Sequence, residues 1–200
     1  MTTFGLIRHG STIWNKEGRA QGSSDIPLNE NGWQQARLLG QRVAGEQWDR
    51  IYASDLIRAQ QTAQAIGEAA GLEITLDARL RELDGGLIEG TTQAERIERW
   101  GEDWKEKDLG LETPESGATR GVACLQELAQ RHPNEQILIV SHGVLLSHVL
   151  NAILHQQPPK WHSLDNMSIT VVACDAEHKW DCALYNCTNH LLPHEAKPAE

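Results

Sequence analysis

Residues 137–143 read ILIVSHG, four aliphatic residues followed directly by a polar turn. An all-aliphatic run of this kind is typical of a central parallel strand, which is buried on both faces. Residues 3–10, TFGLIRHG, repeat the arrangement, because a second apolar run ends at a histidine followed by glycine. The two stretches therefore predict two buried strands, each ending in a turn that carries a histidine.

Short strands and amphipathic helices alternate along the rest of the chain. Further strands are predicted at residues 50–53, 73–76, 168–174 and 179–185. Apolar residues recur at helical spacing within residues 36–44, 56–70, 118–129 and 145–154. Ser54 or Asp55 is expected to cap the second of these helices. The alternation predicts an α/β fold, a three-layer α/β/α sandwich with a mostly parallel central sheet.

A glycine-rich and highly charged segment interrupts this alternation at about residues 85–121. It carries Trp100 and Trp104, and we interpret it as a small cap inserted into the fold. A length of 200 residues fits one domain, which we expect to span residues 1–192. Residues 193–200, PHEAKPAE, are expected to form a flexible tail.

The composition excludes several classes of protein. With 18 Lys and Arg against 28 Asp and Glu, the chain has a net charge of −10 and no dense basic cluster, so we expect no nucleic-acid partner. No apolar run reaches the roughly 18–20 residues of a membrane-spanning helix, and the N-terminus does not read as a secretory signal. We therefore expect no membrane partner. The four cysteines form no CxxC pair, which favours a reducing, cytoplasmic setting.

Cationic side chains are expected to meet at the carboxyl edge of the predicted sheet. His9 and His142 each follow a strand directly, and Arg8 shares the first turn. Arg58 falls in the first turn of the helix after the strand at 50–53. In open α/β sheets this edge holds the active site. Two arginines, two histidines and helix N-termini at one edge predict a site for a phosphate dianion.

No histidine pattern in the sequence indicates a metal site. There is no HExxH motif, and His142 and His148 are six residues apart, which does not place them on one helix face. We therefore expect no metal ion and no cofactor, and we expect arginine and imidazole to neutralise the phosphate. Each residue alone has an ordinary interpretation, since a histidine after a strand is more often a hydrogen-bonded turn residue. Their occurrence at equivalent strand ends carries the prediction.

Five motifs along the chain strengthen this interpretation. They are RHGxTxxN at 8–15, GxxDxPLxxxG at 22–32, SxLxRAxQTA at 54–63, LRE at 80–82 and SHG at 141–143. Together they resemble the histidine phosphatase superfamily, also called phosphoglycerate-mutase-like, over nearly the whole chain. The short length and the NMSI and NHL sequences at 166–169 and 189–191 are most similar to bacterial broad-specificity phosphatases.

The resemblance implies a role for each matching residue. His9 would be the nucleophile that forms a phosphohistidine, and Glu82 would protonate the leaving alkoxide. Arg8, Arg58 and His142 would hold the phosphoryl oxygens. Partial burial under the cap would favour the protonated form of Glu82. The residues assigned to substrate binding are Asn15, Gln21, Gly22 and Gly143.

The predicted activity is hydrolysis of phosphomonoesters of small metabolites through a phosphohistidine. The alternatives are phosphoryl transfer of the phosphoglycerate mutase type, alpha-ribazole phosphatase activity, and an inactive phosphopeptide-binding module. Mutases of this superfamily have a larger insertion before the second histidine, so the short segment between Glu82 and His142 favours hydrolysis. The presence of both His9 and Glu82 disfavours an inactive module. The sequence does not predict the oligomeric state.

The sequence departs from the superfamily pattern on the leaving-group side of the expected site. Gly85 and Gly86 stand where an aromatic residue followed by glycine is usual, and Ile88 stands where tryptophan is common. The identity of the alcohol therefore cannot be transferred from any one relative.

Overall fold

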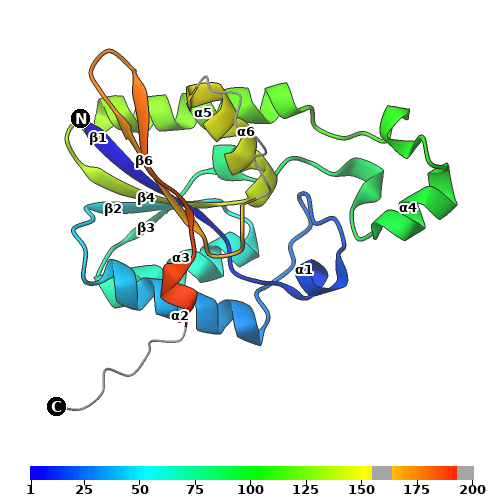
Figure 1. The fold of residues 1–200 in the computed structure, drawn as a ribbon, viewed down its shortest axis with the longest axis horizontal. Coiled ribbons are helices and arrows are strands. Elements are labelled where there is room, and N and C mark those ends of the chain that lie inside the picture. The colour runs from blue at the N-terminus through cyan, green and yellow to red at the C-terminus, as the bar shows by residue number, and fades with distance from the viewer. Residues whose placement is uncertain (155–163, 193–200) are drawn as a thin grey trace.

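A six-stranded sheet forms the centre of the computed structural model, which describes residues 1–154 and 164–192 (Figure 1). Its strands are β1 (Thr2–Arg8), β2 (Arg50–Ala53), β3 (Ile74–Leu76), β4 (Gln136–Ser141), β5 (Ile169–Cys174) and β6 (Trp180–Cys187). They lie in the order β3-β2-β4-β1-β5-β6, in which β5 runs antiparallel to both β1 and β6 and the other neighbours are parallel. The predicted mostly parallel α/β fold is confirmed.

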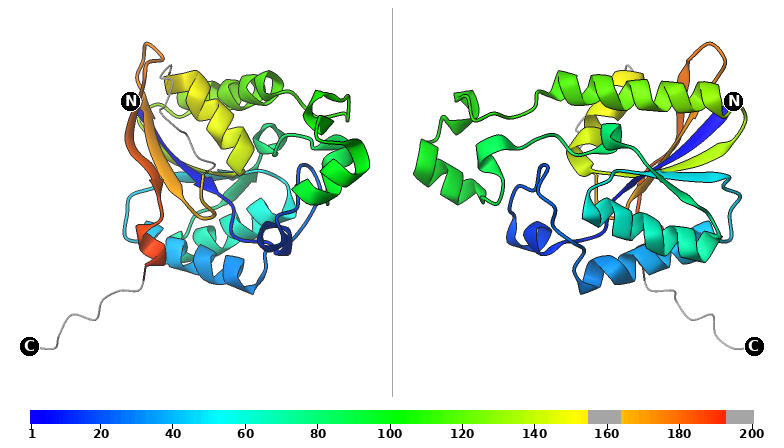
Figure 2. Two further views of the ribbon diagram at one scale, coloured as in Figure 1. Left: turned by 45° about the vertical axis from the view of Figure 1, so that its right-hand side comes forward. Right: turned by 180° about the vertical axis from the view of Figure 1, so that it is seen from behind.

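Helices cover both faces of the sheet (Figures 1 and 2). The long helices are α2 (Glu30–Val43), α3 (Ile57–Ala70), α5 (Pro114–Arg131) and α6 (Gly143–Leu154). Side chains of α2 and α3 share one core cluster, and side chains of α5 and α6 share the other. The sandwich therefore has two cores, one on each side of the sheet.

The strand β4 shows why both cores are apolar. Ile137 and Ile139 belong to the core beneath α5 and α6, whereas Leu138 and Val140 belong to the core beneath α2 and α3. All four side chains are fully buried. Successive side chains of a strand point to opposite faces, so an uninterrupted aliphatic run supplies both cores at once.

The strands that precede the predicted site end at one edge of the sheet. Arg8 at the end of β1 pairs in register with Ser141 at the end of β4, and Ala53 at the end of β2 pairs with Val140. The turns after these three strands therefore emerge side by side. This register brings residues more than 130 positions apart in the sequence to one place, as Arg8 and Ser141 show.

The predicted cap of α3 is wrong. The residue before the helix is Leu56, which makes no capping bond with its side chain. The hydroxyl of Ser54 lies instead against the ring of His142, and the carboxylate of Asp55 binds the guanidinium of Arg81. The Ser54 hydroxyl also accepts from the backbone N–H of Leu56 at 3.3 Å, but Leu56 precedes the helix, so neither side chain caps it.

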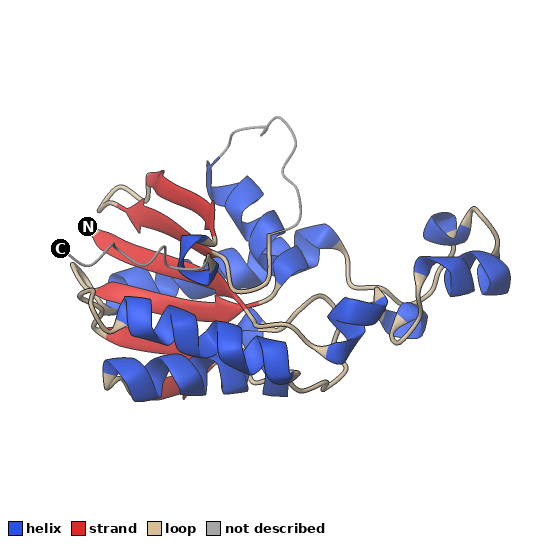
Figure 3. Cartoon of the chain, turned by 60° about the horizontal axis from the view of Figure 1, so that its bottom comes forward, coloured by secondary structure: helices blue, strands red, loops and turns tan. Residues whose placement is uncertain are grey.

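The segment predicted as a cap projects away from the sheet in its first part. It contains α4 (Gln93–Trp100) and a turn of 3₁₀ helix at Trp104–Glu106 (Figures 1 and 3). Trp104 packs there with Ile88 and Leu109 in a small cluster separate from the two main cores. The cap therefore has its own apolar centre.

The second part of residues 85–121 lies on the body of the protein, because α5 begins at Pro114. A Cβ atom at Gly117 would come within 2.5 Å of Leu83, and one at Gly121 within 2.4 Å of Val149. These glycines allow α5 to pack closely against its neighbours. The predicted tail at 193–200 lies outside the described residues, and within those residues no helix is long and apolar enough to span a bilayer.

Candidate active site

A cavity of about 410 Å³ opens at the carboxyl edge of the sheet, between the body and the base of the cap. Most of the predicted site residues line it: Arg8, His9, Asn15, Gln21, Gly22, Arg58 and Glu82. His142 and Gly143 are not among the lining residues. The register of the strands explains the gathering, since Arg8 and His9 follow β1 while Arg58 and Val144 lie in the first turns of the helices after β2 and β4.

His9 is buried, with 2% of its surface exposed, and is held by its own turn. The ring Nδ1 lies 2.8 Å from the carbonyl oxygen of Gly10. A carbonyl can only accept a hydrogen bond, so Nδ1 carries the proton and Nε2 of the neutral ring keeps its lone pair. Burial and the charges of Arg58 and Arg8 hold the pKa of His9 well below its ordinary value. The imidazole is therefore neutral at physiological pH.

Arg58 is fully buried, and its guanidinium is fixed by three acceptors. Nη1 donates to the carbonyl of Ser24 and Nη2 to that of Gly22, each at 2.7 Å, while Nε donates to Nδ1 of His142 at 3.2 Å. Burial lowers the pKa of Arg58 to about 10, which leaves it cationic at neutral pH. Each terminal nitrogen carries a second N–H group, so the fork can still bind an anion.

His142 is fully buried and contacts Arg58 without lining the cavity. Its Nδ1 accepts from Arg58, so its Nε2 donates to the hydroxyl of Ser54 at 2.8 Å. Both ring nitrogens are thus bound by protein groups, and the ring centre lies 5.2 Å from that of His9. Burial, followed by the charge of Arg58, keeps the pKa of His142 well below its ordinary value. In this structure His142 orients Arg58 and does not face the cavity.

Arg8 passes directly over Gly143. Its Nη1 donates to the carbonyl of Leu164, and its Nε is buried without a hydrogen-bond partner among the described residues. A Cβ atom at Gly143 would come within 3.0 Å of that Nε. Gly143 therefore makes room for the Arg8 side chain, a different position from the substrate contact that the resemblance implied.

The loop after α1 (Ile13–Glu17) closes another side of the cavity. Thr12 caps α1, and its backbone N–H donates to Oδ1 of Asn15 at 3.1 Å. Its hydroxyl donates to Oε1 of Gln21 at 3.0 Å. Gly22 has a φ of +47°, and a Cβ atom there would lie 2.0 Å from the carboxylate of Glu89. Only glycine fits this position, which brings the loop against the base of the cap.

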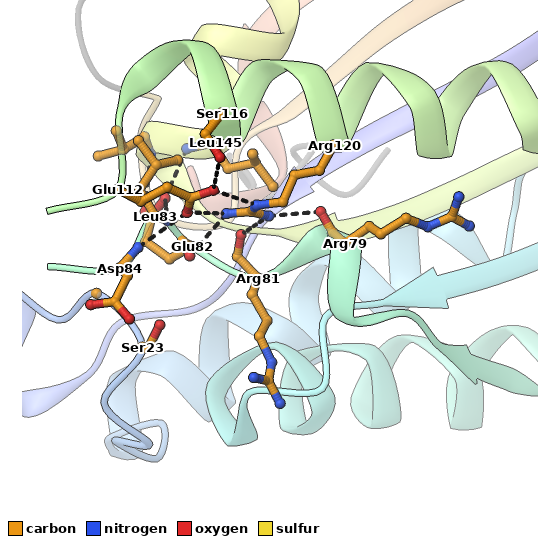
Figure 4. Close-up of polar contacts among 12 residues, drawn as sticks. Ser23, Arg79, Arg81, Glu82, Leu83, Asp84, Glu112, Ser116, Arg120 and Leu145 are labelled. Atoms are coloured by element: carbon orange, nitrogen blue, oxygen red, sulfur yellow. Dashed lines mark hydrogen bonds and ion pairs between the residues drawn. The ribbon is translucent and has the colours of Figure 1, made fainter. Parts of the chain in front are cut away.

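Glu82 lies at the N-terminus of α6 (Figure 4). Its Oε1 accepts from the backbone N–H groups of Leu145 at 2.8 Å and Leu83 at 3.0 Å, and its Oε2 accepts from that of Val144 at 3.0 Å. The Glu82 side chain is half-buried, as expected. The resting structure therefore holds Glu82 as an acceptor at the helix end.

Residues 4–188 match the profile of the histidine phosphatase superfamily (branch 1). The chain belongs to this superfamily. It is 36% identical to a Bacillus subtilis protein named "uncharacterized phosphatase PhoE" over 192 residues, which cover 96% of this chain and 97% of that protein. It is 37% identical to the "probable phosphoglycerate mutase GpmB" of Salmonella paratyphi A over 158 residues, which cover 74% and 73% of the two chains.

Solved structures of superfamily members share the fold. Bacillus stearothermophilus YhfR matches with a TM-score of 0.86 and 30% identity, covering 96% of this chain and all of that one. The phosphoserine phosphatase of Entamoeba histolytica, solved as an H9A mutant in complex with phosphoserine, matches with a TM-score of 0.81 and 32% identity over 96% of this chain and all of that one. The Entamoeba histolytica protein and PhoE are named as phosphatases, and this chain is an enzyme of the same superfamily.

Phosphatases of this superfamily act without a metal ion. Within residues 1–154 and 164–192, no group of three or more His, Cys, Asp or Glu side chains is placed to hold one. The positive charge next to the His9 ring comes from Arg8 and Arg58.

The sequence did not predict the role of several residues at this site. Ser54 was predicted to cap a helix, although its place at the start of the SxLxRAxQTA motif indicated a role in the site, where it binds His142. The cavity is also lined by residues that no motif singled out: Arg19, Leu83, Leu111, Glu112, Val144 and His148. Val144 and His148 come from α6, and Leu83, Leu111 and Glu112 come from the two segments at the base of the cap. Arg19 comes from the loop after α1, so the three regions meet only in the folded chain.

The part of the cavity away from His9 is lined by two acidic side chains, Asp84 and Glu112. The carboxylate of Glu112 is paired with Arg120. Arg19 lines the cavity too, but its guanidinium donates to Glu95 at 2.7 Å and to Glu17 at 2.9 Å. Two acidic partners offset its charge, so the free cations of the cavity are concentrated at the inner end, next to His9.

Proposed function

We propose that the protein hydrolyses phosphomonoesters of small metabolites through a covalent phosphohistidine at His9. The observation that carries the proposal is a neutral imidazole with its Nε2 lone pair available, held in the cavity beside Arg8 and Arg58. A neutral nitrogen can attack phosphorus, whereas an imidazolium cannot. The two guanidinium groups supply the positive charge that a phosphate dianion needs.

The reaction divides into two displacements at phosphorus. In the first, Nε2 of His9 forms a bond to phosphorus while the bond to the ester oxygen breaks, and Glu82 gives its proton to the departing oxygen. In the second, a water molecule attacks the phosphohistidine, gives a proton back to Glu82 and releases phosphate. Arg8 and Arg58 stabilise the charge on the equatorial oxygens in both steps. Asn15 and the Gln21–Gly22 loop complete the phosphate cradle.

Glu82 must be protonated when the ester bond breaks. A substrate phosphate held by Arg8 and Arg58 brings about two negative charges into the cavity that Glu82 lines. Like charges disfavour a second anion nearby, so the bound dianion favours the protonated carboxyl group.

The charges of the outer cavity favour hydrolysis over phosphoglycerate mutase activity. A phosphoglycerate carries a carboxylate on its leaving-group side, which would meet Asp84 and an Arg19 already paired with two glutamates. An uncharged alcohol meets no such repulsion. The similarity to PhoE, which spans 96% of this chain, supports the same assignment, and four free cysteines support a cytoplasmic location.

A panel of substrates distinguishes the two activities. We expect release of inorganic phosphate from uncharged alkyl and aryl phosphates, and no interconversion of 2- and 3-phosphoglycerate beyond the uncatalysed rate. Phosphate release is followed colorimetrically and isomerisation by phosphorus NMR in the same samples. Isomerisation faster than hydrolysis would assign the chain to the mutases instead.

Activity is expected to survive removal of metal ions. Prolonged dialysis against EDTA should leave kcat and KM unchanged within about twofold, because Arg8 and Arg58 take the part that a metal ion plays in other phosphatases. The measurement is phosphate release before dialysis, after dialysis, and after adding Mg²⁺ or Zn²⁺. Loss of activity that either ion restores would contradict the all-protein phosphate site.

A further inference from the structure

The guanidinium of Arg120, outside the phosphate site, donates a hydrogen bond from every one of its N–H groups. Arg120 of α5 donates from Nε to Oε1 of Glu112 at 2.9 Å and from Nη2 to Oε2 of the same carboxylate at 2.8 Å. Its other N–H groups donate to the backbone carbonyls of Arg79 at 2.7 Å, Arg81 at 2.6 Å and Glu82 at 3.1 Å (Figure 4). An arginine has five N–H donors, and here all five are bound.

The three carbonyls belong to the segment that carries Glu82. Arg120 thus fixes the backbone of this segment from α5, while the N–H groups of Val144 and Leu145 fix the Glu82 carboxylate from α6. No other side chain among the described residues donates to the carbonyl of Glu82. The position of the carboxylate relative to the phosphate site therefore depends on both helices.

Glu112 connects the same guanidinium to the base of the cap. Its backbone N–H donates to the carbonyl of Asp84 at 2.9 Å, and the backbone N–H of Asp84 lies 3.3 Å from Oε2 of Glu112. The segment that enters the cap, at Asp84, is thus hydrogen-bonded to the segment that leaves it, at Glu112. The hydrogen bonds from Arg120 hold the pKa of Glu112 at about 2, so the ion pair persists across the neutral range.

We propose that Arg120 is a positioning residue that aligns Glu82 with the ester oxygen by tying the segment 79–82 to Glu112 at the base of the cap. The proposal rests on the function proposed for Glu82. Arg120 itself does not line the cavity, so it acts through Glu82 and not on the substrate. A displacement of about 1 Å in a catalytic group can cost about 10²-fold in rate, so the effect is measurable.

The test compares an alkyl and an aryl phosphate. An alkoxide needs a proton as it leaves, whereas p-nitrophenolate departs almost unaided, so the ratio of the two rates reports on the proton donor. We expect Arg120→Lys and Arg120→Met to lower kcat/KM for glycerol 2-phosphate by about 10- to 100-fold and for p-nitrophenyl phosphate by much less. Lysine keeps the charge but cannot reach five acceptors, so both variants should show the effect.

The matched control is Arg131→Met, which removes an exposed arginine of the same helix that pairs only with Glu127 among the described residues. It should leave both rates unchanged. Glu112→Gln keeps the shape of the side chain that binds Arg120 but removes its charge, which weakens the ion pair. It should lower the alkyl-to-aryl rate ratio, as the Arg120 variants do, but by less. This variant tests the proposal even where Arg120→Met fails to fold.

Combining Arg120→Lys with Glu82→Gln should change the alkyl-to-aryl ratio no further than Glu82→Gln alone, because both act on one proton transfer. Equal losses on the two substrates, with or without a lower melting temperature, would show a purely structural role and overturn the proposal. The two hypotheses fail differently. If Glu82→Gln changes the alkyl-to-aryl rate ratio and the Arg120 variants do not, only the positioning role of Arg120 is wrong. If Glu82→Gln leaves that ratio unchanged, the proton-donor role of Glu82 is wrong, and the proposal for Arg120 is wrong with it.

Discussion

His9→Ala is expected to reduce kcat by about 10³-fold or more for every phosphomonoester, because the variant lacks the Nε2 lone pair that attacks phosphorus. The fold should survive, since the backbone N–H of His9 bonds to the carbonyl of Ser141 whatever the side chain. The measurements are steady-state phosphate release and the far-ultraviolet circular dichroism of the variant.

The control for this variant is His148→Ala. His148 lines the same cavity from α6 but lies outside the turn after β1, so its loss should leave most of the activity in place. A second observation separates the chemistry from binding. Brief incubation with labelled substrate followed by a base quench should trap an acid-labile, base-stable phosphoprotein in the wild type and none in His9→Ala. Substantial turnover by the folded His9→Ala variant would rule out the covalent mechanism.

The sequence was sufficient to predict the sheet edge that carries the site. The apolar runs before His9 and His142 predict buried strands, and parallel strands that end together bring their turns together. The structure has β1 ending at Arg8 in register with Ser141 at the end of β4. A strand and the turn that follows it can be predicted because the residues of one continuous stretch of chain determine both.

Interactions between distant segments were not readable in the same way. Ser54 precedes a helix, and a serine there usually caps it, but its hydroxyl binds His142, which lies 88 positions further along. Nothing local to Ser54 indicates that partner. The same holds for Gly143, whose glycine was visible in a motif while its reason, the close approach of Arg8, required the packed structure.

The setting of Glu82 is the most instructive difference. The sequence suggested a carboxyl group kept protonated by burial under a cap, whereas the structure gives it three backbone donors, two of them from the start of α6. The two donors from α6 lie more than 60 positions along the chain from Glu82, so no local pattern around Glu82 indicates them.

Glu82→Gln is expected to lower kcat/KM by about 10²-fold or more for glycerol 2-phosphate and by far less for p-nitrophenyl phosphate. The amide cannot give a proton to the departing oxygen, and only the alkoxide needs one. Steady-state rates for a series of phosphates with leaving alcohols of graded basicity measure the effect as a slope. The wild type should show a shallow dependence on leaving-group basicity and the variant a steep one.

The comparison between substrates matters more than the absolute loss, because glutamine is not a neutral replacement here. The two carboxylate oxygens of Glu82 accept from Leu145 and Val144 separately, and an amide can offer an oxygen to only one of them. That structural cost falls on both substrates alike and cancels in their ratio. Asp84→Asn provides the control, since Asp84 lines the same cavity and should not change the slope. A steep slope in Asp84→Asn, with a shallow one in Glu82→Gln, would identify Asp84 as the proton donor instead.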